Sequence, residues 1–272
     1  MPPELSLGVP AARRAARRRW LPQGAVGWLL PLALLGAIEL AAALGWSGSR
    51  ALPPPSEVLR AMWGLGGHAL AAHVLASSAR VLVGFALGSL LALAVGAAVG
   101  LSARVSAWVD PGLQALRVIP SLAWVPLLLL WLGIDELPKL VLIAIGAFFQ
   151  VYLGVVSGLR GIDGRLVEFG RVHGFTRAML LRHVMLPAAL PSVLTGLRSG
   201  LGLAWMFMVA AELIAASNGL GYLLTDGRET GRADLVLAAI LLLALLGHLS
   251  DGAMRALERR LLAWRDAAEP GR

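Results

Sequence analysis

Few residues of this sequence have the types and spacing that enzymes use for covalent, metal or phosphate chemistry. The five histidines show no HExxH spacing, which indicates solvated or interfacial side chains rather than zinc ligands. There is no cysteine, so disulfides and thiolate metal sites are excluded. Lys139 is the only lysine, and no Gly-Lys-Ser/Thr step surrounds it, so a phosphate-binding loop is absent. We therefore expect no catalytic residues, metal or cofactor in this chain.

The polar residues that could act on a partner protein are concentrated in residues 160–187, between two long apolar runs. Connecting segments of this length between spans usually have a function of their own. An acid at its start predicts a short helix from Glu168 to His173, and Gly174 interrupts it. Thr176 predicts the N-cap of a second helix over residues 177–185, and Pro187 is expected to end that helix.

A second set of candidate residues lies within the apolar run that follows this segment. Arg198 lies about ten residues into the run, roughly 15 Å from its start at 1.5 Å per residue. A guanidinium at that depth needs a watery path, an acid on another helix, or a position from which it can reach the interface. Glu212 is about 21 Å further along the same helix and cannot be its partner. Trp205 could face either a path or lipid. Arg198, Trp205 and Glu212 are the candidate path residues.

The composition places these candidates in an integral membrane protein. Of the 272 residues, 58% are hydrophobic and 15% charged, and the mean hydropathy is +0.75. Such an apolar chain predicts an all-α membrane protein with helical spans. The net charge of +8 is concentrated in segments that flank the spans. This distribution favours a role in membrane orientation over nucleic-acid binding.

Apolar periodicity predicts six transmembrane helices. They are expected at residues 25–45, 81–101, 116–134, 140–159, 188–211 and 235–250. Around them we expect a basic cytoplasmic N-terminus (1–24), a periplasmic segment (46–78) with an interfacial helix capped by Ser56, and a cytoplasmic tail (251–272). The transmembrane core would cover residues 79–250 and include the segment 160–187. With six spans both termini lie on one side, and the arginine distribution places that side and the segment 160–187 in the cytoplasm.

Glycines and prolines within the spans indicate a packed bundle. Gly84xxxGly88 and Gly96xxxGly100 allow helices to approach closely. Pro120 and Pro126 fall inside the third predicted span, where neighbouring helices must satisfy the freed backbone groups.

The polar segment resembles the EAA motif of permease subunits in bacterial ATP-binding-cassette (ABC) importers. The usual pattern is Glu-Ala-Ala-x-x-x-Gly, nine residues, then Ile-x-Leu-Pro. This sequence keeps the pattern at Glu168, Gly174, Leu186 and Pro187. It departs at Phe169 and Gly170, where alanines are usual, and has Val184 in place of isoleucine.

The resemblance covers residues 52–264. Segments 52–58, 118–126, 130–136, 186–192 and 211–222 are similar to the branch that transports sulfonates, taurine and nitrate, and the C-terminal third is most similar to aliphatic sulfonate permeases. The resemblance implies the type I ABC importer permease fold in the bacterial inner membrane. A sulfonate is a permanent anion with three acceptor oxygens, which Arg198 could neutralise.

The resemblance also implies the partners. Two permease copies would form the path, two cytoplasmic ABC ATPases would bind ATP and Mg²⁺, and a periplasmic protein would deliver the substrate. Residues of the motif would couple the permease to the ATPase: Glu168, Phe169, Gly170, Arg171, Gly174, Leu186 and Pro187. Taurine, nitrate or a pyrimidine vitamin precursor is the alternative substrate. A secondary transporter, with inverted repeats or coupled intramembrane ions, is the alternative of a different class.

Overall fold

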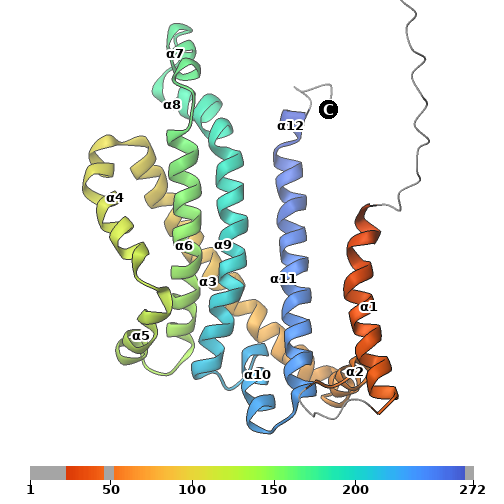
Figure 1. The fold of residues 1–272 in the computed structure, drawn as a ribbon. Coiled ribbons are helices and arrows are strands. Elements are labelled where there is room, and N and C mark those ends of the chain that lie inside the picture. Colours follow the sequence, from red (N-terminus) through yellow and green to blue (C-terminus); the bar gives the residue numbers. More distant parts are fainter. Residues whose placement is uncertain (1–22, 46–51, 267–272) are drawn as a thin grey trace, which may run out of the picture. The chain divides into compact units, whose positions relative to one another are not determined.

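The computed structural model describes residues 23–45 and 52–266, and every regular element within them is a helix. The chain divides into two units, Met1–Ser49 and Arg50–Arg272. The first unit contains α1 (Gln23–Ala43), a helix that overlaps the first predicted span, residues 25–45. All other helices belong to the second unit, which carries both sets of candidate residues (Figure 1).

Four long helices form the second unit: α3 (Gly67–Leu101), α6 (Glu136–Arg160), α9 (Leu186–Ala215) and α11 (Ala233–Leu261). Helix α6 makes the most extensive contacts, with α3 on one side and α9 on the other. Its residues Ile143, Ala147 and Val151 have no exposed surface. The core of the unit is therefore centred on α6.

Glycines explain why α6 packs so closely against both neighbours. A Cβ at Gly88 of α3 would overlap the backbone of Ala144, and one at Gly96 would lie 2.9 Å from Val155 Cβ. On the other side of α6, a Cβ at Gly154 would lie 2.8 Å from Gly196 Cα in α9. The close helix approach that the glycine spacing predicted is confirmed.

The third predicted span is wrong as one straight helix over residues 116–134. The structure has α4 (Ala103–Val118), a 91° bend, a 3₁₀ turn η1 (Ser121–Trp124) and α5 (Val125–Leu132). Pro120 disfavours the helical conformation for the residue before it, and Ile119 is extended with φ −68° and ψ 123°. Pro126 falls in the first turn of α5, where a missing N–H is tolerated.

The number of spans is not confirmed as six. Within the described residues, four helices are long and apolar enough to cross a membrane, and the bent α4–α5 pair raises the number to five. Helix α1 supplies only a shorter apolar stretch, Leu32–Ala43. Helix α11 continues past residue 250 to Leu261 and is followed by α12 (Ala263–Asp266).

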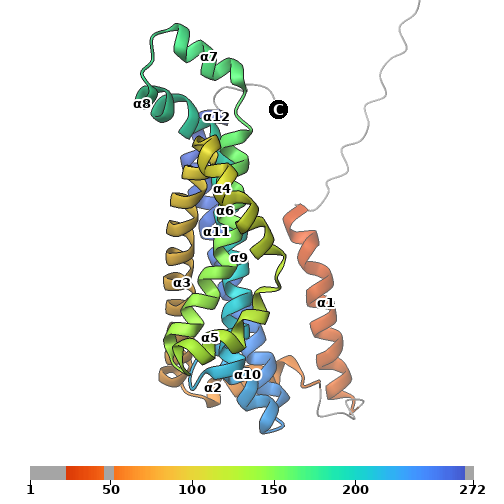
Figure 2. The same cartoon turned by 90° about the vertical axis from the view of Figure 1, so that its left-hand side faces the viewer.

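Short helices cover the two ends of the second unit. Helices α2 (Pro55–Gly64) and α10 (Leu220–Glu229) lie at one end, and α7 (Gly164–Val172) and α8 (Arg177–Leu180) lie at the other (Figures 1 and 2). The expected cap of α2 is wrong: Pro54 holds the N-cap position, and Ser56 lies inside the helix because Pro55 begins it.

Candidate functional site

The first helix of the polar segment begins earlier than the sequence predicted. Helix α7 begins at Gly164, and the Asp163 side chain accepts a hydrogen bond of 2.9 Å from the Arg165 N–H. The start predicted at Glu168 is therefore wrong, because Asp163 provides the N-terminal carboxylate. Glu168 instead lies in the middle of α7 with an exposed side chain.

Gly174 ends α7 in the geometry of a Schellman motif. Its φ is +78°. This left-handed conformation is unfavourable for any residue that has a Cβ atom, so glycine is preferred there. The Gly174 N–H donates to the Arg171 carbonyl, and the Phe175 N–H donates to the Gly170 carbonyl, both at 3.0 Å. A Cβ at Gly170 would lie 2.6 Å from Leu180 Cδ1. Glycine at position 170 thus allows α8 to fold back against α7.

The second helix of the segment continues into a span. Thr176 Oγ1 accepts from the Met179 N–H at 3.3 Å, which confirms the predicted N-cap. After α8 comes a π turn η2 (Leu181–Met185), in which the Leu186 N–H donates to the Leu181 carbonyl. The predicted helix end at Pro187 is wrong. The π turn allows helical structure to continue through the proline, which cannot donate to the ladder, into α9.

The outer surface of α7 has the character of a protein-binding surface. Phe169 is 63% exposed, and its ring lies 4.0 Å from the His173 ring, centroid to centroid. Glu168 and Arg171 are exposed in the same helix. An exposed aromatic ring flanked by charges is typical of a binding surface. Leu186 is exposed, and Pro187 half-buried, where α9 begins.

Two of the candidate path residues bind α11. Arg198 pairs with Asp251, with Nη2 3.1 Å from Oδ2, and the two side chains are 40% and 36% exposed. Trp205 Nε1 donates to Ser250 Oγ at 2.9 Å. The structure therefore places an acid of another helix beside Arg198, one of the three environments open from the sequence. Neither residue lies beside the third candidate.

Glu212, the third candidate, is buried at the other end of α9. Its carboxylate accepts from Ser77 Oγ at 2.8 Å, from Arg80 Nη1 at 2.6 Å and from the Gly221 N–H at 2.8 Å. Gly221 is in the first turn of α10, so Glu212 also stabilises the start of that helix.

Glu212 belongs to a group of four charged side chains that we call the charged cluster: Arg80, Glu136, Lys139 and Glu212. Arg80 binds the Glu136 carboxylate through two hydrogen bonds, Nε at 2.7 Å and Nη2 at 2.8 Å, and Lys139 Nζ lies 2.9 Å from Glu136 Oε1. The sequence analysis missed Arg80, Glu136 and Lys139. In the sequence these residues differ from their neighbours only as charged residues near apolar runs. No local pattern predicts that Arg80 of α3 meets Glu136 and Lys139 of α6.

Another polar group anchors α4 beside the polar segment. Tyr152 Oη donates to Asp110 Oδ1 at 2.6 Å, and Arg160 Nη2 lies 3.0 Å from Asp110 Oδ2. Arg160 is the last residue of α6, just before the polar segment. This group ties the broken span to the base of that segment.

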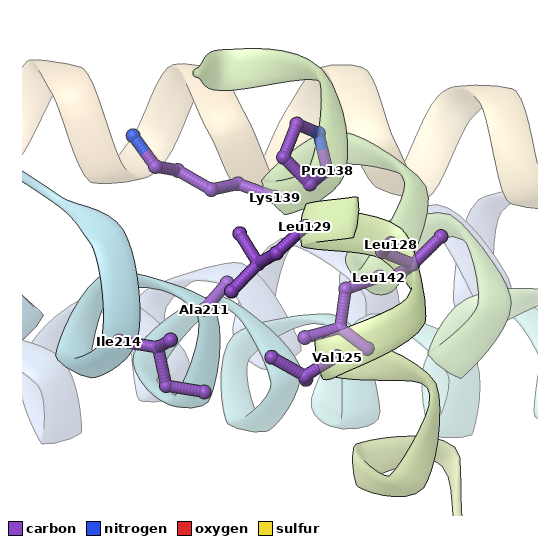
Figure 3. A pocket seen from close by; sticks show the side chains of 8 residues that line it. All are labelled: Val125, Leu128, Leu129, Pro138, Lys139, Leu142, Ala211 and Ile214. Carbon is purple, nitrogen blue, oxygen red and sulfur yellow. The ribbon is translucent and has the colours of Figure 1, made fainter. Parts of the chain in front are cut away.

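Two of the hollows between the helices are apolar. One lies between α5, α6 and α9 and is lined by residues such as Val125, Leu142 and Ile214; the Lys139 ammonium group points away from it (Figure 3). A larger hollow of about 680 Å³ lies between α3, α4 and α6, and leucine and phenylalanine side chains dominate its lining. Neither offers a polar ligand site. Within the described residues, no group of three histidine or acidic side chains could hold a metal ion.

Comparison with known proteins agrees with this geometry. Residues 84–263 match the family model described as binding-protein-dependent transport system inner membrane component. An aliphatic sulfonates transport permease protein, SsuC of Bacillus subtilis (strain 168), is 38% identical, with 99% of each chain covered. The taurine transport system permease protein TauC of Escherichia coli (strain K12) is also 38% identical, over 78% of this chain and 80% of that protein.

The fold also matches a solved transporter structure. A chain of the MetNI methionine ABC transporter, in an inward-facing conformation, superposes with a TM-score of 0.63 over 74% of this chain and 98% of its own length. The two sequences are 24% identical, so this likeness concerns the fold.

Proposed function

Because the chain belongs to the family of binding-protein-dependent transport system inner membrane components, and is thus an ABC transporter permease, we propose that it imports an aliphatic sulfonate. The observation that carries the proposed drive by a partner ATPase is the connection from α7 and α8, through the π turn, into the span α9. A partner that moves the exposed segment would move a transmembrane helix directly. A secondary transporter would have no use for such a docking segment.

The proposed assembly contains two copies of this permease, two ATPase subunits and a periplasmic delivery protein. ATP and Mg²⁺ would bind to the ATPase chains. The arginine distribution favours a cytoplasmic position for the α7/α8 end, since short cytoplasmic loops are enriched in arginine. The α2/α10 end would then face the periplasm and the delivery protein.

Coupling would proceed by rigid movement of the α7–α8 segment. Phe169 would insert into an apolar groove of the ATPase, with Glu168 and Arg171 making polar contacts at its rim. Gly170 and Gly174 fix the angle between α7 and α8, and Leu186 and Pro187 begin the span that receives the force. Closure of the ATPase pair would then shift the bundles between outward and inward access.

The substrate is proposed from the relatives and from charge. A sulfonate keeps its negative charge at all physiological pH values, and arginine donors suit its oxygens. Taurine also carries a sulfonate group and is the nearest alternative; nitrate and a pyrimidine vitamin precursor are more distant ones. Uptake of radiolabelled ethanesulfonate, in competition with each of these, separates them.

The proposal is tested by co-purification from detergent with the candidate ATPase. We expect the wild type to retain the ATPase and Glu168→Ala to lose it, while Glu229→Gln, at the opposite end on α10, retains it. ATP-dependent uptake should disappear when the ATPase is deleted. A permease that purifies alone and moves sulfonate in vesicles without nucleotide would contradict the proposal.

A further inference from the structure

We propose that Arg80 and Lys139 form an anion-binding site at the α2/α10 end of the bundle, which the Glu136 carboxylate fills in this structure. The transported anion would displace Glu136 as it enters the path. This inference rests on the proposed function and adds to it the first point at which the permease binds its substrate.

The Arg80 guanidinium has one side whose partners are fixed and another side whose partner can be exchanged. Nη1 donates to Glu212 Oε1 and to the Asn218 carbonyl at 2.8 Å, and Nη2 also donates to Asn218 Oδ1. These bonds fix the guanidinium between α3, α9 and the loop before α10. The Nε–Nη2 edge is directed at Glu136, in the two-bond arrangement that arginine forms with carboxylates and similar anions.

The exposed fractions of the side chains show which member of the charged cluster can move out into water. The side chains of Arg80 and Lys139 are 7% and 6% exposed, whereas that of Glu136 is 50% exposed. Glu136 is also the first residue of α6, so its side chain can rotate into water without disturbing the helix. Arg80 would stay in place because Glu212 and Asn218 hold its guanidinium. Lys139 would stay because its side chain is buried in the packing of α6.

Charge balance then requires a replacement. With Glu136 in place, the charged cluster has two positive and two negative side chains and is neutral. Once Glu136 swings out, two buried cations face only the buried carboxylate of Glu212. An uncompensated buried charge is costly, and a small anion removes that cost. Departure of Glu136 and entry of an anion are therefore coupled.

The donors fit a sulfonate in particular. Arg80 Nε, Arg80 Nη2 and Lys139 Nζ converge on the two oxygens of one carboxylate. A sulfonate offers three acceptor oxygens to these three donors. A neutral sulfone has two such oxygens without the charge and should not bind.

The test measures binding of ethanesulfonate to the full-length chain in lipid nanodiscs, by calorimetry and by ligand-dependent thermal shift. Ethyl methyl sulfone serves as the neutral comparison at constant ionic strength. Glu136→Gln removes the competing carboxylate and should tighten ethanesulfonate binding at least tenfold. Glu136→Asp, with its shorter stem, should give an intermediate affinity. Glu229→Gln, an exposed carboxylate on α10, should match the wild type.

Adding Lys139→Met to Glu136→Gln should remove the gain, because the third donor is lost. The proposal is overturned if neither Glu136 variant binds more tightly than the wild type, or if the gain persists without Lys139. A cluster that serves only to hold the helices together would give the first result, and an anion site elsewhere in the chain would give the second. ATP-dependent uptake with an unchanged affinity in the Glu136 variants would remove this site and leave the proposed function standing. Tighter binding by Glu136→Gln, together with sulfonate uptake that needs neither ATP nor an ATPase, would support this site and contradict the proposed function.

Discussion

Single residues show how this protein keeps charge inside its bundle. Arg80 is paired with Glu136 and Glu212, Arg198 with Asp251. Each pair joins different helices, so the charges also fix which helices are neighbours. An ionisable group within a span needs such a partner or water, and the pairs therefore serve both solvation and specificity.

The Arg198–Asp251 pair gives a stability prediction. Asp251→Asn leaves the guanidinium without its carboxylate, and we expect a lower melting temperature of the purified protein. Arg198→Gln placed in the same chain should recover the part of the loss that comes from Arg198, because neither charge of that pair then remains. The exposed contact of Asp251 with Arg255, at 3.3 Å, stays broken. Arg228→Gln, an exposed position on α10, is the control. Purely additive changes in melting temperature would show that the two side chains do not interact.

Uptake by the recovered double variant separates the roles left open for Arg198. If Arg198 lines the path and neutralises the anion, the stable Arg198→Gln, Asp251→Asn protein loses sulfonate uptake. If the pair only joins α9 to α11, uptake returns with stability. The measurement is the initial rate of ATP-driven uptake in proteoliposomes.

Gly174 gives a prediction about coupling. Gly174→Ala forces a Cβ into a left-handed conformation, at a cost of about 1–2 kcal/mol, and the α7–α8 angle should relax. We expect less ATPase to co-purify with this variant. Gly164→Ala in the same segment has open space around its Cβ and no positive φ, so it should retain the partner. Equal retention by both variants would show that the joint is not needed.

At the scale of helices, the close approach of α3 to α6 is the most demanding feature. Gly88→Ala would drive a methyl group into the Ala144 backbone, and such overpacking costs about 1–3 kcal/mol. We expect a lower melting temperature and reduced yield. Gly247→Ala in α11 meets no atom within 4 Å and should leave both unchanged. A wild-type melting temperature for Gly88→Ala would mean that the helices can separate freely.

Helix positions were predictable where the pattern was local and strong. The apolar runs of α6, α9 and α11 were located, and so were the N-cap at Thr176 and the tight glycine contacts. For α3 only the part from residue 81 was predicted, whereas the helix begins at Gly67. The broken span was not predicted. Arg104, Asp110 and Arg117 lower the hydropathy of α4, so the apolar pattern did not show that the helix begins at Ala103. Pro120 was recognised, but it was placed in the interior of one helix and no bend was predicted.

The site was predictable only in its local part. The α7–α8 segment has its own motif, so its residues could be named from the sequence. The π turn depends on how α8 and α9 share hydrogen bonds around Pro187, which no local pattern specifies. The charged cluster joins residues more than fifty positions apart, such as Arg80 and Glu136, and only the packing of α3 against α6 brings them together.

At the scale of the whole molecule, the two ends have different tasks. The α7/α8 end bears the proposed ATPase contact, and the α2/α10 end bears the charged cluster. The absence of native cysteine allows their sides to be tested by labelling. We expect Glu229→Cys to react with an impermeant maleimide in intact spheroplasts, and Gly164→Cys to react only after permeabilisation. The reverse pattern would invert the proposed orientation.

The glycine contacts on both faces of α6 have a consequence for how this molecule can move. Helices α3, α6 and α9 touch backbone to backbone, so sliding between them would require atoms to pass through one another. These three helices should move together as one rigid body. Spin labels on α3 and α9 would then report the same spacing with and without ATP, while a label on α5, beyond the 91° bend, would report the change.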